Sequence, residues 1–309
     1  MRSRFTPKKI IMGATTFLVA ALVLNIGFYF LFPDVAKLKK QNPRKTSFME
    51  YREKEWQQQG KNNDIRFFWT PLSQISPYVV KAVLIAEDDK FWGHEGFDFE
   101  AMKKAMEKDI RRGSFRAGGS TVSQQLAKNL YLTPSRNPVR KIKEAVLTWR
   151  IEHSLSKRRI IELYLNVAEW GEGIFGIGAA AQHYYGKSAS ELGAMEAARL
   201  ATVLPNPRRW DPTGPSSYIE YRSQQIYQIM VRRGIVIEDY DDVMSAPQEE
   251  TEDEAPESSE EPEFAEEREE VDVQAESDAD SDKGETVTNT GALPLEPEPL
   301  DPEPESEEP

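Results

Sequence analysis

Cysteine is absent from this chain of 309 residues, so neither disulfide bonds nor thiolate chemistry is available to it. Internal repeats are absent as well, and no segment alternates apolar and polar residues strongly enough to rival the helical patterns along the chain. These absences exclude disulfide-stapled domains, thiol-dependent enzymes and repeat architectures. They favour a mainly α-helical chain without covalent cross-links.

Positive charge is scarce at the C-terminal end and plentiful elsewhere, so the net charge of −13 describes neither part. Residues 248–309 hold 26 acidic and 2 basic residues, a balance of −24, whereas the rest of the chain has a balance of +11. Glu, Asp, Pro and Ser dominate residues 246–309. Such a composition cannot bury enough apolar surface to fold, so we predict a disordered acidic tail there.

An apolar run of 23 residues, residues 10–32, is long enough to span the ~30 Å hydrocarbon core of a membrane. Its aromatic-rich end offers no small-residue cleavage site, so we predict an uncleaved transmembrane helix. A short basic end (residues 1–9) precedes it, and a polar juxtamembrane connector (residues 33–64) follows. Basic residues flank the run on both sides, so charge alone leaves its orientation open.

Helical patterns dominate residues 65–245, after a short extended run at residues 65–69. Apolar residues recur at helical spacing, and glycine, proline or capping residues bound each run. A helix capped by Ser120 is predicted to hold Val122, Leu126 and Leu130. The other predicted helices cover residues 76–86, 99–112, 138–155, 157–168, 177–185, 190–204 and 216–233.

Four short blocks carry the chemistry of this region. They are residues 86–96 (AEDDKFWGHEG), 118–125 (GGSTVSQQ), 140–144 (RKIKE) and 157–166 (KRRIIELYLN). Taken alone, the first block reads as a solvated helix end, because runs of charge usually lie at the surface. The order and spacing of all four favour a functional site instead.

In that order the blocks closely resemble those of family 51 glycosyltransferases, the peptidoglycan polymerases. The family's blocks read E-D-x-x-F-x-x-H-x-G, G-x-S-T-x-x-Q-Q, R-K-x-x-E and K-x-x-I-x-E-x-Y-L-N. The resemblance covers roughly residues 65–210, and the single-domain layout is similar to that of monofunctional transglycosylases. It implies a lysozyme-like, mainly α glycosyltransferase domain over residues 65–245, with a larger lobe and a small membrane-facing jaw.

The resemblance also implies an activity and a place. The activity is polymerisation of lipid II by β-1,4 linkage with inversion and release of undecaprenyl diphosphate, without transpeptidation. The place is the bacterial inner membrane, with the N-terminus in the cytoplasm and the catalytic domain in the periplasm. The implied partners are lipid II, the growing lipid-linked glycan, membrane lipid and other cell-wall or division proteins, but no nucleic acid.

Glu87 is the predicted general base. It lies at a predicted helix C-terminus, where the helix dipole disfavours the ionised carboxylate and raises its pKa, and a base with such a pKa suits proton abstraction from a sugar hydroxyl. The resemblance gives Glu87 the same role.

Glu144 is the second predicted catalytic carboxylate. Arg140 lies four residues before it, so a plain helical ion pair is the alternative. The resemblance implies that Glu144 assists the departing diphosphate, directly or through a divalent cation such as Mg or Mn. No other metal ligand is predicted.

Basic side chains are predicted to hold the diphosphate, because guanidinium and ammonium groups match phosphate oxygens. These are Lys128, Arg136, Arg140, Lys141 and Lys143, of which the resemblance favours Lys128 and Arg136. It further implies that the second block lines the donor site, although the same residues would also cap a helix. The remaining predicted substrate-binding residues are Asp88, Phe91, His94, Ser120, Thr121, Gln124 and Gln125. Phe91 and His94 are also expected to shape the turn after Glu87.

Two motifs are rejected. Residues 171–176 spell the dinucleotide fingerprint G-x-G-x-x-G, but no βαβ unit surrounds them, and we expect a loop there. Residues 154–157 spell the S-x-x-K of transpeptidases, but the chain has no K-T-G.

A glycan-cleaving lytic enzyme and a non-catalytic membrane scaffold are the two alternative functions. The basic side chains predicted to hold a diphosphate argue against the lytic enzyme, and intact Glu87 and Glu144 argue against the scaffold.

Overall fold

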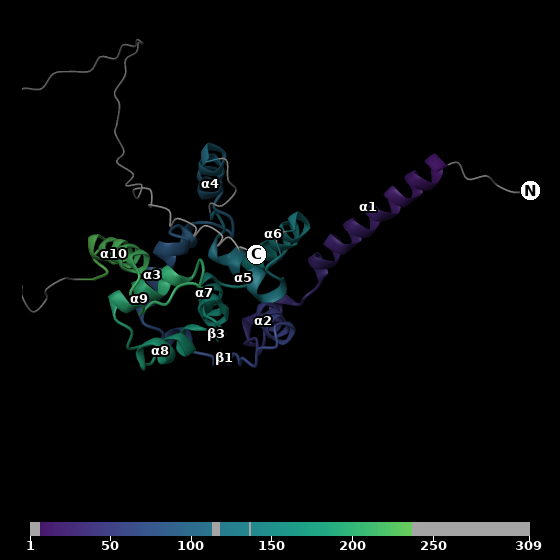
Figure 1. Cartoon of the computed structure of the whole chain (residues 1–309). Helices are drawn as coiled ribbons and strands as arrows, with labels where there is room; N and C mark the ends of the chain where they lie inside the picture. Colours follow the sequence, from purple (N-terminus) through teal and green to yellow (C-terminus); the bar gives the residue numbers. More distant parts are fainter. Residues whose placement is uncertain (1–6, 113–117, 136, 237–309) are drawn as a thin grey trace, which may run out of the picture. The chain divides into compact units, whose positions relative to one another are not determined.

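The computed structural model describes residues 7–112, 118–135 and 137–236 (Figure 1). Arg136 and the predicted acidic tail therefore lie outside the described residues. Within them the chain is mainly helical, as predicted. The α-helices are α1 (Pro7–Leu31), α2 (Ser47–Gln58), α3 (Pro77–Glu87), α4 (Phe99–Arg112), α5 (Val122–Tyr131), α6 (Pro138–Ser154), α7 (Lys157–Val167), α8 (Ile177–Tyr185), α9 (Ala194–Val203) and α10 (Ser217–Arg232).

A small sheet joins distant parts of the chain. It has the order β1-β3-β2, with β1 (Arg66–Phe67) parallel and β2 (Glu169–Gly171) antiparallel to β3 (Ile174–Phe175). The loop expected at residues 171–176 is thus part of a hairpin, which corrects that prediction. Strands this short carry too few residues for an alternating pattern to be recognised.

The segment predicted as a plain connector, residues 33–64, packs onto the domain. Met49 and Trp56 of α2 are each 1% exposed, and the buried Arg52 of the same helix binds Glu169 of β2 through Nε and Nη2, at 3.0 and 2.8 Å. The sequence of α2 is polar, so its few inward-facing side chains gave no clear apolar stripe.

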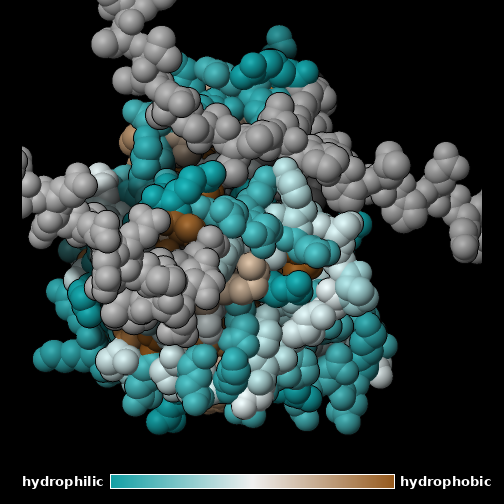
Figure 2. All heavy atoms as spheres, turned by 90° about the vertical axis from the view of Figure 1, so that its left-hand side faces the viewer, coloured by the Kyte–Doolittle hydropathy of each residue, from teal (hydrophilic) through white to brown (hydrophobic). Residues whose placement is uncertain are grey.

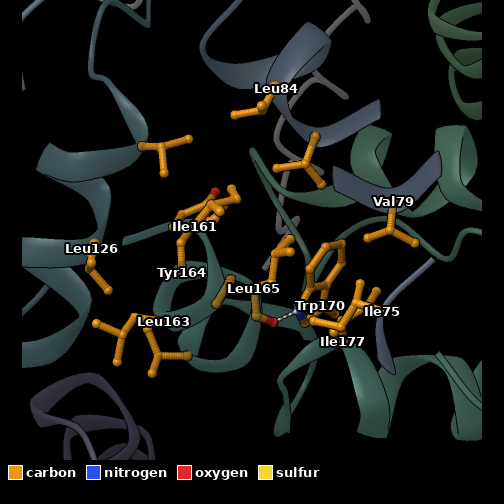
Figure 3. Close-up of a cluster of buried hydrophobic side chains, with 14 of the residues drawn as sticks. Ile75, Val79, Leu84, Leu126, Ile161, Leu163, Tyr164, Leu165, Trp170 and Ile177 are labelled. Carbon is orange, nitrogen blue, oxygen red and sulfur yellow. Dashed lines mark hydrogen bonds between the residues drawn. The ribbon is translucent and has the colours of Figure 1, made fainter. Parts of the chain in front are cut away.

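The core is built around α7, whose apolar residues are buried on several sides. Figure 3 shows Ile161, Leu163 and Leu165 from α7 among side chains from the neighbouring helices, with the Trp170 Nε1 donating a hydrogen bond of 3.3 Å to the Leu165 carbonyl. Helix α5 packs against both α6 and α7, while α3 packs against α9 and α10. Full burial of each large apolar side chain contributes about 1.5–3 kcal/mol, so this cluster fixes the helices that carry the site.

The segment Ile11–Lys39, which covers most of α1 and the residues just after it, is long and apolar enough to cross a membrane, and its apolar 18-residue window has a mean hydropathy of 2.0. Its apolar side chains are exposed, among them Phe17, Leu18 and Leu24. Among the residues that the structure describes it is the one candidate span, which fits the predicted single membrane anchor. The last turn of α1 contacts α6, so the anchor ends against a helix of the domain.

Candidate active site

Glu87 is the last residue of α3. Pro77 occupies the first helical turn, and the apolar residues Val79, Val83 and Leu84 bury one face of the helix. The backbone N–H of Asp88 closes the helix by donating to the Leu84 carbonyl at 2.9 Å. The helix therefore stops at Glu87, whose side chain borders a cavity lined also by residues of α4 and by residues 118–121.

A neutral amide holds the Glu87 carboxylate. The Gln125 Nε2 donates to the Glu87 Oε2 at 2.6 Å, and the Tyr164 hydroxyl donates to the Gln125 Oε1 at 3.1 Å. Because the tyrosine hydroxyl occupies the amide oxygen, the amide nitrogen is directed at Glu87. The predicted base is thereby positioned from α5 and α7 without a direct ion pair.

Burial raises the pKa of Glu87. Asp88 raises it further, whereas the Gln125 hydrogen bond and the charges of Lys128 and Arg222 oppose the shift. The predicted direction is confirmed, but the first cause is loss of hydration rather than the helix dipole invoked from the sequence. A carboxylate with a raised pKa is a better proton acceptor near neutral pH.

The turn after Glu87 is fastened to the start of α5. The His94 Nε2 lies 2.8 Å from the Asp88 Oδ1, and the Asp88 Oδ2 accepts from the Val122 N–H at 2.9 Å. The His94 Nδ1 accepts from the Gly96 N–H at 3.0 Å, so the proton is on Nε2 and His94 donates it to Asp88. His94 is therefore a bonded scaffold residue, as expected.

Gly96 completes this fastening. Its φ of +92° lies in the left-handed region, and a Cβ there would stand 2.8 Å from the Glu152 Cγ and 2.9 Å from the Thr148 Cγ2. Its carbonyl accepts from the Thr121 hydroxyl at 2.7 Å. A side chain at this position would push the turn away from α6, and Glu87 with it.

Four of the predicted substrate-binding side chains make their main contacts within the protein, and their substrate-binding role stays a prediction. Thr121 and Gln124 form a capping box at the start of α5, which places the cap at Thr121 rather than at the predicted Ser120. Phe91 is 0% exposed and Asp88 is 7% exposed, with both Asp88 oxygens bonded. These contacts position the site, and Asp88 and Thr121 also line the cavity beside Glu87.

Glu144 lies on α6 and is 2% exposed. Its Oε2 accepts from the Arg140 Nη1 at 2.7 Å, and its Oε1 accepts from the Lys141 Nζ at 2.5 Å. The Lys141 Nζ also lies 3.0 Å from the Ser120 Oγ. The helical ion pair considered as the alternative is therefore present, and Lys141 extends it to the second block.

Lys128 of α5 lies in the electrostatic field of both carboxylates. Burial lowers the pKa of Lys128, and the nearby cations Arg140 and Lys141 lower it further, whereas Glu144 and Glu87 oppose that shift. Lys128 is thus brought together with Glu87, Glu144, Arg140 and Lys141. Lys143 lies to the other side of Arg140: its Nζ is over the Tyr29 ring of α1, 4.8 Å from the ring centre, and it lines a separate pocket together with Arg140.

The geometry does not suit a divalent cation at Glu144. Both carboxylate oxygens already accept from positively charged side chains, and a metal ion there would meet their repulsion. Among the residues that the structure describes, no group of three His, Asp or Glu side chains stands close enough together to hold a metal ion.

The fourth block braces the site, as expected. The Asn166 side chain forms two hydrogen bonds with the Thr70 backbone, at 2.8 and 2.9 Å, and the Glu162 Oε1 accepts from the Leu72 N–H at 3.1 Å. These bonds tie α7 to the segment before α3. They hold the helix that carries Tyr164 in register with the helix that ends at Glu87.

Sequence reasoning missed two arginines, Arg222 of α10 and Arg233, the residue that caps the C-terminus of α10. Arg233, at its C-terminal end, donates from Nη1 and Nη2 to the two Asp89 oxygens at 2.5 and 2.9 Å, and Arg222 contributes positive charge near Glu87. The two arginines are eleven residues apart, about three turns, and so lie on one helix face. The spacing of the two arginines can be read from the sequence. No nearby residue, however, indicates that this face of α10 contacts α3.

The fold and the site are those of a mainly helical enzyme with one N-terminal helix apolar enough to cross a membrane, and with a partly buried carboxylate near several cations. The family model described as Transglycosylase matches residues 53–231, more than half of the chain. The chain belongs to the transglycosylase family.

Several relatives named biosynthetic peptidoglycan transglycosylase are similar to the chain. The one from Azoarcus sp. is 52% identical over 194 residues, which is 63% of this chain and 84% of the relative. The one from Aromatoleum aromaticum is 49% identical over 205 residues (66% and 89%), and the one from Methylobacillus flagellatus is 48% identical over 195 residues (63% and 85%).

Proposed function

We propose that this chain is a peptidoglycan glycosyltransferase of cell-wall synthesis that polymerises lipid II, with Glu87 as its general base. The observation that carries the role of Glu87 is its setting: a carboxylate whose pKa is raised by burial, held by the Gln125 amide at 2.6 Å and close to Lys128. Membership of the transglycosylase family supports the activity.

In the proposed reaction, Glu87 accepts the proton of the 4-hydroxyl group of one sugar. The hydroxyl oxygen then bonds to the anomeric carbon of the next sugar, from the face opposite the diphosphate, and the carbon–oxygen bond to the diphosphate breaks. The product is a β-1,4 linkage with inversion, and undecaprenyl diphosphate leaves. Proton transfer to a positioned base typically contributes 10²–10⁴-fold to the rate.

The leaving diphosphate is stabilised in this proposal by Lys128, Arg140 and Lys141, because charge-assisted hydrogen bonds to phosphate are strong. Glu144 is proposed to act through its two cationic partners, setting the direction of the Arg140 guanidinium and the Lys141 ammonium. Arg136, outside the described residues, stays a predicted contact.

We propose that the N-terminus faces the cytoplasm and that α1 anchors a periplasmic domain. Helix α4 would form the small membrane-facing jaw. Phe99, Met106 and Ile110 of α4 are 72, 56 and 65% exposed, and their spacing of seven and four residues puts them on one helix face. Such a face suits contact with membrane lipid. Other cell-wall or division proteins remain proposed partners.

The deciding experiment gives the purified full chain, in lipid vesicles, a labelled lipid-linked disaccharide-peptide and resolves the products on a gel. Polymer formed by the native chain and lost in Glu87→Gln supports the proposal. Shortening of preformed glycan without polymer would support the lytic alternative. If the native chain neither forms polymer nor shortens glycan, the result would support the scaffold alternative.

A further inference from the structure

The end of the membrane helix is held by α6. The Arg150 Nη1 donates to the Tyr29 carbonyl at 3.0 Å, and the Arg150 Nη2 donates to the Leu31 carbonyl at 3.2 Å. These carbonyls belong to the last turn of α1 and have no partner within the helix. About two turns earlier on α6, the Lys143 Nζ lies over the Tyr29 ring. The stretch of α6 from Lys143 to Arg150 therefore lies beside the point where α1 ends.

The level of that point in a membrane follows from the length of α1. Its 25 residues extend about 37 Å, which exceeds the ~30 Å hydrocarbon core, so its last turn reaches the headgroup region. Tyrosine and tryptophan concentrate at that level, and so do lysine and arginine near helix ends. Tyr29, Lys143, Trp149 and Arg150 are this set of residue types.

Two large apolar side chains of α6 point outward at the same place. Ile142 is 49% exposed and Trp149 is 48% exposed, and their separation of seven residues puts them on one helix face. Trp149 lies beside Phe30 of α1, with ring centres 6.5 Å apart. The apolar surface of α1 thus meets the exposed face of α6 at Trp149. By contrast, the face of the domain that carries α8, α9 and α10 is mostly hydrophilic where it is coloured (Figure 2).

We propose that the face of α6 carrying Ile142 and Trp149 docks on the bilayer beside α1, at the boundary between headgroups and acyl chains. The proposal rests on α1 being the membrane anchor of the proposed function. Its occupant is membrane lipid, because the face continues the lipid-facing surface of the anchor and has cations at its headgroup side.

Docking of α6 has a consequence for the reaction. Arg140, Lys141 and Glu144 lie on the same helix, within one turn of Ile142, so a docked α6 keeps them close to the plane of the lipid phosphates. A diphosphate carried by a membrane lipid then meets these side chains without its lipid leaving the bilayer. The docked face becomes part of what selects a lipid-linked donor.

The absence of cysteine makes the test direct. Ile142→Cys and Trp149→Cys, each made in the full chain, give single sites for a nitroxide label in nanodiscs of phosphatidylcholine and phosphatidylglycerol. The matched control is Tyr221→Cys on α10, where Tyr221 is 44% exposed. Collision rates are then measured with oxygen, which concentrates in lipid, and with a water-soluble nickel complex.

The expected result is a several-fold higher ratio of oxygen to nickel collisions at positions 142 and 149 than at position 221. A ratio at both positions equal to that at 221 would overturn the proposal. Protection of both labels from both reagents would overturn it as well, since it would mean that a protein or a second copy covers the face. The measurement needs no turnover, so its result does not depend on whether the chain has the proposed activity.

A second measurement asks what docking does for the reaction. Ile142→Asp should slow polymerisation of a donor embedded in vesicles at least several-fold, and should slow a short-chain, water-soluble donor analogue much less. Tyr221→Asp should leave both rates unchanged. Equal slowing of both donors by Ile142→Asp would show damage to the site itself, and would contradict the role of docking in donor access.

Discussion

Glu87 and Glu144 are two glutamates of one site with opposite surroundings. Glu87 accepts a hydrogen bond from a neutral amide, and its nearby cations act at a distance. Glu144 binds a guanidinium and an ammonium group directly, at 2.7 and 2.5 Å. The first carboxylate is set up to receive a proton, whereas the second is paired directly with two cations.

The comparison teaches that packing, and not residue type, assigns the two roles. A carboxylate that is to accept a proton has to be desolvated without a direct cation, since a cation would stabilise its charge and weaken it as a base. A carboxylate that organises phosphate-binding cations has to be bonded to them.

Removing the base should have the largest effect. Glu87→Gln keeps the size and the hydrogen-bonding capacity of the side chain but cannot accept the proton, so the polymerisation rate should fall by about 10²–10⁴-fold. Initial rates with a labelled lipid-linked donor measure this. Asp89→Asn, which neutralises the exposed carboxylate two positions later, is the control and should lower the rate far less. Retention of more than about a tenth of the native rate in Glu87→Gln would rule out the base role.

Removing the Lys128 ammonium group, which interacts electrostatically with both carboxylates, should have the second-largest effect. Lys128→Ala removes a charge-assisted contact of about 1.5–3 kcal/mol, which corresponds to roughly a 10–100-fold loss in use of the diphosphate donor. Donor affinity and rate in detergent measure it. Lys143→Ala, whose cation lies over Tyr29 instead, should lose less in detergent. Normal polymerisation by Lys128→Ala would mean that other cations hold the diphosphate.

The two glutamates should affect stability in opposite directions. The folded-state pKa of Glu87 is raised, so its contribution to stability is present at acidic pH and is lost as the pH rises through that pKa. Glu87→Gln should therefore stabilise the protein at pH 7–8, with the gain disappearing at acidic pH.

Glu144→Gln should instead lower the free energy of unfolding by about 1–2 kcal/mol, because two cations lose their partner and are only partly screened by water. Thermal unfolding at several pH values measures both variants. If both substitutions changed the free energy of unfolding in the same direction at pH 7–8, the two environments would not differ in their effect on stability.

The smallest effect should come from the acidic C-terminal segment. Its charge of −24 is tethered to a remainder of +11, so it is expected to compete weakly with the diphosphate for cations. A chain ending at Ser245 should polymerise at least as fast as the full chain, with any advantage at low salt fading as the Debye length falls to about 8 Å at physiological ionic strength. A truncated chain that folds and stays in the membrane but is inactive would show that the segment belongs to the working domain.

Much of the fold could be predicted from the sequence because its helices carry local signals. The apolar spacing of α3 and the cap and stop residues of α5 to α10 are readable within one or two turns. Helix α2 was missed because its stabilising contact is non-local: Arg52 is buried against Glu169, 117 residues away. The hairpin of β2 and β3 was missed because its strands are too short to show a period.

The sequence predicted which residues belong to the site, but not which role each of them has. The first two blocks contain Glu87 and Gln125, and in the structure the Gln125 Nε2 lies 2.6 Å from the Glu87 Oε2. The same blocks also contain Phe91 and Gln124, which are buried and only position the others. A local motif mixes these two kinds of residue, because both are needed for one geometry and only the three-dimensional contacts separate them.

The most direct test of the central claim is the pH dependence of kcat/KM for polymerisation. If Glu87 is the base and burial raises its pKa, the acid limb of the profile should fall with one proton at a pH clearly above the value of about 4.3 for an ordinary glutamate. The residual activity of Glu87→Gln should lack that limb. A limb at or below about 4.3, or one that persists unchanged in Glu87→Gln, would contradict the assignment of Glu87 as the base.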